Sequence, residues 1–318
     1  MHNGRVRLRR TTSNVSFGPL HTDSDPQGSG RPTDKSRFAA LAHLLGDPSP
    51  TVWTAVRREL EQAGAAALPT LRKAARADAA DVRARARTIL AQLDKRKALR
   101  RLVRYACRDT IDLERALLLL GRHHTPGLDP RPYLRALDAM ALEVSRRAHM
   151  KTRELDRALT LVDYLGEELE LGGSVGEFHH PDNIHLHRAI ERRAGMPLTL
   201  CAIYQSVAQR SGLNVSILPL PGHVMLRLHG DEESLIVDPY HYGRTRSQRD
   251  CLEYLAEHGL AFEAEWFRGA SDRVLFRRQV MNLTRSAEKR GLKQDARELT
   301  KLLLVLGRPV ATPAARRA

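Results

Sequence analysis

The stretch GMPLTLCAIYQSVAQRSGL (residues 195–213) decides the fold of this chain, together with LPGHVMLR (residues 220–227) and VDPYHYG (residues 237–243) after it. Apolar residues recur in the first stretch at helical spacing. The stretch becomes polar toward its C-terminal end, where Gly212 follows. Glycine commonly terminates helices. The first stretch therefore predicts a helix over residues 198–211.

The two later stretches belong to a predicted β-hairpin. Apolar and polar residues alternate over residues 223–229 and again over residues 234–238, which is the pattern of half-buried strands. Between them, GDEE (residues 230–233) has the composition of a hairpin turn. We therefore expect the helix to pack on a small antiparallel sheet.

Three residues in this region are capable of joint chemistry: Cys201 in the helix, His223 at the start of the first strand and Asp238 at the end of the second. A thiolate can attack an acyl carbon, an imidazole can shuttle the proton, and a carboxylate can orient the imidazole. Cys201, His223 and Asp238 are therefore the candidate catalytic residues.

Composition and charge set the broad class of the protein. The chain has 318 residues, 42% of them hydrophobic and only 5% aromatic, which favours a helical globular protein. Its formal net charge is +15, which raises nucleic-acid binding as a hypothesis. The basic residues are dispersed along helices that also carry Glu, so charge alone is a weak indication of such a partner.

Cysteine usage and the longest apolar runs predict a cytoplasmic protein. Cys107, Cys201 and Cys251 are widely separated, which suggests neither a disulfide framework nor a thiolate zinc site. The apolar runs at residues 116–120 and 302–306 are too short to cross a bilayer, so no membrane association is expected. The Arg-rich start also fits an organellar transit peptide, although its Gly and Pro content favours a disordered tail.

The chain is predicted to divide into five parts. Recurring helices with Asp-rich turns resemble HEAT-type repeats before residue 98, and a plain helical bundle is the alternative. The last helices, broken at Gly291, resemble a single tetratricopeptide unit. The predicted parts are a disordered basic tail (1–34), HEAT-like helices (35–97), a central domain (98–270), a helical hairpin (271–308) and a second disordered tail (309–318).

The three quoted stretches, with HPDNIHL (residues 180–186) ahead of them, resemble the SirB-type branch of the transglutaminase-like superfamily. The resemblance covers roughly residues 110–300. It implies a papain-like α+β fold, mostly helical, with a small antiparallel sheet. It also implies the triad order that Cys201, His223 and Asp238 follow.

Cys201 departs from the pattern of the catalytic members, whose nucleophile begins the helix about fifteen residues before the terminal Gly. Counting back from Gly212 reaches Pro197, so Cys201 lies a full turn further in. There it receives little of the stabilisation that first-turn amides give a thiolate. Because Leu200 and Ile203 flank it on an apolar arc, the sequence favours a buried and unreactive thiol over a nucleophile.

His223 and Asp238 fit the pattern better. If the hairpin turn has an even number of residues, Met225 pairs with Asp238, and His223 and Asp238 share one face of the sheet. The alternatives are a His bonded to backbone at a strand edge and an Asx turn before Pro239. Three further residues are expected to line a polar cleft beside the pair: Thr199, Arg227 and Tyr240.

A second group, His179, His180, His185 and His187 with Asp182, is dense enough to suggest a metal. No two of these His residues are four apart, the spacing that places both on one helix face, so we predict no metal site and no cofactor.

The sequence thus favours a non-catalytic interaction or regulatory protein with a transglutaminase-like cleft and a protein partner on its helical repeats. The alternative is an active cysteine hydrolase or acyl transferase, a protease or amidase, that uses Cys201, His223 and Asp238. Nucleic-acid binding is a third hypothesis.

Overall fold

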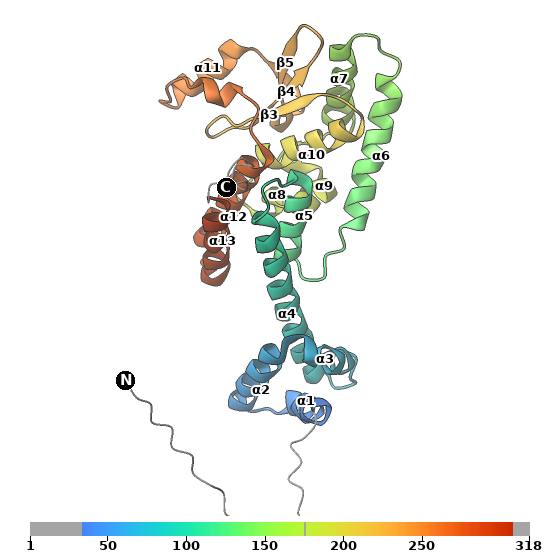
Figure 1. Cartoon of the computed structure of the whole chain (residues 1–318), viewed down its shortest axis with the longest axis vertical. Coiled ribbons are helices and arrows are strands. Elements are labelled where there is room, and N and C mark those ends of the chain that lie inside the picture. Colours follow the sequence, from blue (N-terminus) through green and yellow to red (C-terminus); the bar gives the residue numbers. More distant parts are fainter. Residues whose placement is uncertain (1–33, 175, 308–318) are drawn as a thin grey trace, which may run out of the picture.

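The computed structural model describes residues 34–174 and 176–307, which are mostly helical and carry two small sheets (Figure 1). The predicted disordered tails lie outside these residues, except for Asp34, which begins the first helix. In this part of the chain no helix has the length and apolar character needed to span a membrane. The helices are α1 (Asp34–His43), α2 (Pro50–Ala63), α3 (Leu68–Ala74), α4 (Ala80–Ala106), α5 (Leu113–His124), α6 (Arg131–Ala148), α7 (Glu154–Val162), α8 (Pro181–Ile184), α9 (Leu186–Arg192), α10 (Pro197–Arg210), α11 (Gln248–Glu257), α12 (Asp272–Lys289) and α13 (Lys293–Leu306).

The first three helices and the start of α4 enclose a small core of their own, at the foot of the molecule in Figure 1. Helix α2 begins at Pro50, whose fixed φ angle and missing N–H suit the first turn of a helix. The fully buried members of this core are Leu45, Leu60, Ala67, Leu71, Ala86 and Ile89.

Helix α4 is one continuous helix across the boundary that the sequence predicted between residues 97 and 98. It contains neither Gly nor Pro, and Lys95, Arg96 and Lys97 are good helix formers, so nothing in the segment interrupts it. Lys95 also pairs with Asp295 of α13. Figure 1 shows α4 as the connection between the small core and the rest of the molecule.

Helix α10 runs through the middle of the larger core. It is apolar around most of its circumference, which is the pattern of a helix that is covered on all sides. Side chains from α5, α6, α7, α12 and α13 belong to the same core. The fully buried hydrophobic residues that α10 contributes are Leu200, Cys201, Ile203, Tyr204, Val207 and Ala208.

The predicted antiparallel sheet is confirmed and has four strands in the order β3-β4-β5-β6. Its strands are β3 (Val215–Leu218), β4 (Met225–His229), β5 (Ser234–Asp238) and β6 (Arg244–Arg246). One face, carrying Leu226, Leu228 and Val237, packs in the larger core with α10. The other face carries Met225 and Ile236, which pack on α11 in a third cluster. Both faces of the sheet are therefore covered.

A second, two-stranded sheet places the tyrosines that follow β5. In it, β1 (Gly172–Gly173) pairs in parallel with β2 (Ala194–Gly195). A Cβ atom on Gly173 would lie 2.7 Å from the ring of Tyr240, and one on Gly172 would lie 2.4 Å from the ring of Tyr242. Because both contacts are shorter than any normal Cβ contact, the two glycines allow the tyrosines to pack directly on the β1 backbone.

The C-terminal helices α12 and α13 form a hairpin that turns at Gly291, whose φ is +69°, a conformation that favours glycine. Leu275, Phe276, Leu299 and Leu302 point into the larger core. The hairpin therefore shares its core with α10 and the four-stranded sheet.

Candidate functional site

The fold brings His223 and Asp238 together. Four residues, 230–233, connect β4 to β5, and Leu226 pairs with Val237, so the turn has the even length that the sequence analysis required. His223 lies just before β4, diagonally across from the last residue of β5. Its Nε2 lies 2.9 Å from Asp238 Oδ1, a hydrogen bond from imidazole to carboxylate.

Asp238 is fully buried, and two more side chains reach its other oxygen. His241 Nδ1 donates to Oδ2 at 2.6 Å and Arg246 Nη2 donates to it at 3.4 Å. The backbone N–H of Tyr240 donates to Oδ1 at 3.1 Å. Burial alone raises the pKa of Asp238, but the hydrogen bonds and charges of His223 and His241 outweigh it and lower the pKa to about 2.

Sequence reasoning missed His241 and Arg246. Asp238 caps a short 3-10 turn, Pro239–His241, and that turn directs the side chain of His241 back to the carboxylate three residues earlier. The dipeptide Asp-Pro followed by His at the third position was an available signal for this contact. Arg246 arrives on β6, a strand that the sequence analysis did not include.

His223 is enclosed by aromatic rings, and only 13% of its side chain is exposed. The rings of Tyr240 and Tyr254 lie 5.8 and 5.9 Å from its own, and that of His241 lies at 5.9 Å. The Nδ1 atom makes no hydrogen bond to any residue that the structure describes. This nitrogen is therefore the one left for proton transfer or ligand binding.

The loop before His223 is fastened from two helices. Arg278 of α12 donates to the carbonyl of Pro219 at 2.9 Å and to that of Leu220 at 2.7 Å. The hydroxyl of Tyr254 in α11 donates to the carbonyl of Pro221 at 3.3 Å. These bonds satisfy loop carbonyls and set the position from which His223 reaches Asp238.

Cys201 lies in the interior of α10 and has no exposed surface. Its Sγ donates to the carbonyl of Val224 at 3.5 Å, and no hydrogen bond joins it to His223 in the described residues. Burial raises the pKa of the Cys201 thiol well above its ordinary value, and the negative charge of Asp238 adds to this effect. The first residue of α10 is Pro197, which offers no nucleophile.

The three residues expected to line a cleft lie in different places. Thr199 is fully buried, donates to the carbonyl of Ile184 and accepts a hydrogen bond from Gln279 at 2.7 Å. Tyr240 packs beside His223, and its hydroxyl reaches the carbonyl of Ser174 at 3.4 Å. Arg227 is partly buried on β4, and its Nε makes no hydrogen bond to a described residue.

Residues 131–281 match the family model described as the transglutaminase-like superfamily. This segment is a transglutaminase-like domain. It contains α10, the four-stranded sheet, and the pair His223 and Asp238. The match begins with α6 and ends within α12, so α4 and α13 lie outside it.

Several curated proteins resemble part of the chain. Proteins named UPF0162 protein from two strains of Xylella fastidiosa are each 28% identical over 154 residues, which is 47% of this chain and 53% of those proteins. F-box only protein 21 of Mus musculus is 22% identical over 148 residues, 44% of this chain and 23% of that protein. The chain thus spans about half the length of the first of these relatives. No solved structure was found to match it.

The second group of histidines in the transglutaminase-like domain does not converge on one point. His185 is buried and stacks on His124 with 4.2 Å between ring centres, while His180 accepts from the backbone N–H of Asp182. Burial lowers the pKa of His185 well below its ordinary value and that of His187 to about 4. These two rings are therefore neutral at pH 7.

The groups in the described chain that best suit a cation are those of His223, Asp238 and His241, whose ligand atoms all lie within 4.8 Å of one another. Two imidazoles and a carboxylate are donors that zinc accepts. Arg246, however, places its guanidinium 3.4 Å from the same carboxylate oxygen as His241, where it repels a cation. The arrangement therefore suits a carboxylate that is neutralised by the surrounding side chains.

Proposed function

We propose that the transglutaminase-like domain acts by binding rather than by cysteine chemistry. The observation that carries this proposal is the complete burial of Cys201, whose thiol is bonded to the carbonyl of Val224. A nucleophilic cysteine needs thiolate character and access for its substrate. Cys201 has neither, because burial raises its pKa and the larger core surrounds it.

The position of Cys201 along α10 supports the same proposal. The dipole and free amides of a helix act within its first turn, and Cys201 lies four residues beyond Pro197. The hydrogen bond between His223 and Asp238 then has a structural role. It joins the loop before β4 to the end of β5 and the turn that follows.

The finer assignments belong to this proposal. We assign the domain to the SirB-type branch of its superfamily, the helices before residue 98 to a HEAT-like unit, and the hairpin of α12 and α13 to a tetratricopeptide-like unit. The cytoplasm suits the three cysteines, all of which are free thiols.

The partner that we propose is a protein that docks on the N-terminal helices. A groove of about 1180 Å³ lies between α1 and α3. Phe38, Ala42, Pro69 and Ala74 are among its apolar lining residues. Such a groove is suited to the apolar face of a partner's helix.

An active cysteine hydrolase or acyl transferase is the second candidate. In such enzymes a general base is hydrogen-bonded to a carboxylate that orients it, and His223 and Asp238 are hydrogen-bonded in the same way. In that case, Cys201 would have to become a nucleophile beside His223. The two candidates differ in the reactivity of one thiol.

The deciding experiment is the rate of iodoacetamide labelling at each cysteine of the folded full-length chain, measured by mass spectrometry across a pH series. Exposed Cys107 is expected to be labelled in the folded chain, whereas Cys201 and buried Cys251 react only after unfolding. His223→Ala is expected to leave the Cys201 rate unchanged. Fast labelling of Cys201 at neutral pH that falls in His223→Ala would replace the binding proposal with the enzyme.

A further inference from the structure

Basic side chains that are dispersed in the sequence lie along one face of α4. They follow its helical repeat at steps of three or four residues, from Lys97 through Arg101 and Arg104 to Arg108 just beyond the helix end. Arg87 lies near the same face, about four turns before Arg101. All five side chains are exposed.

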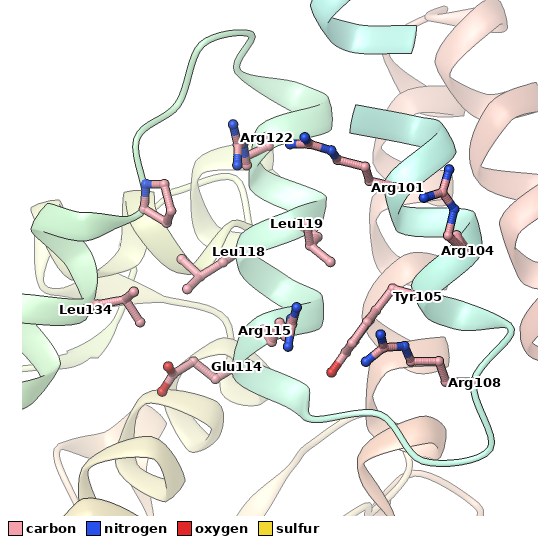
Figure 2. Close-up of a pocket in the computed structure, with 11 residues that line it drawn as sticks. Arg101, Arg104, Tyr105, Arg108, Glu114, Arg115, Leu118, Leu119, Arg122 and Leu134 are labelled. Atoms are coloured by element: carbon pink, nitrogen blue, oxygen red, sulfur yellow. The ribbon is translucent and has the colours of Figure 1, made fainter. Parts of the chain in front are cut away.

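Helix α5 runs beside this face and completes a pocket of about 570 Å³ (Figure 2). Arg101, Arg104, Arg108, Arg115 and Arg122 line the pocket, and Figure 2 shows guanidinium groups from both helices around it. The apolar part of its wall consists of Leu118, Leu119, Pro130 and Leu134.

The pocket has little negative charge to balance its arginines. Its acidic side chain is Glu114, and both oxygens of that carboxylate already accept hydrogen bonds from Arg210, at 2.6 and 2.9 Å. The guanidiniums of Arg108 and Arg115 each lie 5.2 Å from the ring of Tyr105, which holds them without neutralising them.

The pocket continues into a groove along α4. Arg101, Leu119 and Arg122 also line a small neighbouring cavity, which adds Lys97. Asp94, Lys97 and Gly127 connect that cavity to a third one of about 490 Å³, which adds Arg72, Arg87 and Arg100. We call the three together the arginine groove. Its basic residues are Arg72, Arg87, Lys97, Arg100, Arg101, Arg104, Arg108, Arg115 and Arg122, and its acidic residues are Asp94 and Glu114.

None of these nine basic side chains forms an ion pair with a residue in the described part of the chain. Arginines elsewhere do: Arg57 pairs with Glu61, Arg147 with Glu143 and Arg188 with Asp182. Unpaired like charges repel one another, and that repulsion is relieved when a polyanion binds and releases counterions. The groove is therefore organised for a negatively charged ligand with many charges in a row.

We propose that the arginine groove binds a single-stranded nucleic acid. From Arg87 to Arg104 the stripe on α4 extends about 25 Å, at 1.5 Å per helical residue, which suits an extended phosphodiester chain. Arginine binds phosphate through its planar fork and stacks on unpaired bases. The leucines of the pocket wall offer apolar contact for an unstacked base. Bases of a single strand can be splayed out in this way, whereas those of a duplex are paired and stacked.

The test is binding of a fluorescent single-stranded RNA of mixed sequence to the full-length chain, followed by fluorescence anisotropy between about 50 and 200 mM salt. The groove variant combines Arg101→Gln, Arg104→Gln and Arg122→Gln. We expect it to bind at least about tenfold more weakly than the wild type. We also expect the slope of log affinity against log salt to fall by about 2, since each lost phosphate contact on a single strand contributes about 0.7.

The matched control combines Arg58→Gln, Arg244→Gln and Arg297→Gln, which removes the same charge from exposed positions outside the groove. If RNA binding weakens equally in the two variants, the loss of affinity is due to net charge alone, and the proposal is overturned. A duplex that binds as tightly as the single strand would also overturn it. Unlabelled RNA is expected to compete more strongly than polyglutamate or anionic vesicles. If polyglutamate competes as strongly as RNA, the ligand is an acidic protein, and if the vesicles do, it is a membrane; either result would overturn the proposal. Circular dichroism establishes that both variants are folded.

Discussion

Asp238 is the residue on which the candidate site depends. Its carboxylate is fully buried, and side chains from three different positions of the chain bond to it. A buried charge is costly unless its hydrogen-bonding capacity is satisfied, and here four donors satisfy it, including the backbone N–H of Tyr240. The site is therefore held together by one anion.

The low pKa of Asp238 predicts a pH dependence of stability. Since the pKa falls from its ordinary value near 4 to about 2 on folding, the ionised carboxylate stabilises the protein above pH 4, and this contribution is lost as the pH falls toward 2. A shift of this size is worth about 2 kcal/mol. Urea unfolding of the wild type and of Asp238→Asn across this pH range measures it.

We expect Asp238→Asn to lower the free energy of unfolding at pH 7 by about 3 kcal/mol, because it leaves His223, His241 and Arg246 without their anion. The difference between the two proteins should shrink by about 2 kcal/mol on going from pH 5 to pH 2. A difference that stays constant with pH would mean that another group sets the acid stability.

Individual residues of the site were predictable to different degrees. His223 and Asp238 were predicted to meet because the four-residue turn fixes the register of the hairpin. His241 and Arg246 were not, because their contacts depend on a 3-10 turn and on an extra strand. The sequence placed Cys201 a full turn inside its helix but left open whether the thiol is buried, which depends on what covers α10.

At the scale of elements, the loop before β4 is positioned by helices distant in sequence. Arg278 reaches from α12 to two successive carbonyls of this loop, and this pair of bonds needs the fork of a guanidinium. The loop determines where His223 lies relative to Asp238.

Arg278→Lys is therefore expected to loosen the loop although it keeps the charge. We expect a loss of about 1 kcal/mol in the free energy of unfolding, with faster hydrogen–deuterium exchange over residues 222–229. The matched control is Arg277→Lys at the neighbouring exposed position, whose guanidinium forms no hydrogen bond in the described residues other than one to Met281 Sδ. Equal exchange in both variants would contradict a role for Arg278 in fastening the loop.

The elements themselves were predicted well where their sequence pattern is regular. The helix of residues 198–211 and the two strands of the hairpin lie where periodicity placed them. Strands β3 and β6 escaped the sequence analysis because they are short and their pattern is incomplete. The predicted boundary between residues 97 and 98 falls inside α4, because the apolar periodicity weakens at the charged residues 94–97, although Lys95, Arg96 and Lys97 have high helix propensity.

At the scale of the whole molecule, α4 connects two hydrophobic cores. Ile89 belongs to the small core and Leu102 to the larger one. Leu102 follows Ile89 by thirteen residues in the same helix. Because helix formation is cooperative, an unbroken α4 couples the folding of one core to that of the other.

Asp94→Pro should separate the two cores. Proline removes a helical hydrogen bond and clashes with the preceding turn, at a cost of about 3 kcal/mol or more. We expect the small core to unfold in a separate, earlier transition and limited proteolysis to begin near residue 94. Asp94→Ala, which removes the same exposed side chain and keeps the helix, is the control. A single transition in Asp94→Pro would show that the cores are coupled by other contacts.

The sequence by itself determined the helix of residues 198–211, the hairpin and its register, because these depend on local periodicity and turn length. Only the tertiary structure decided that Cys201 is buried, that His241 and Arg246 complete the site, and that nine dispersed basic residues share one groove. Burial and charge density depend on which distant segments cover a residue or lie beside it, and the packing of helices against one another sets both.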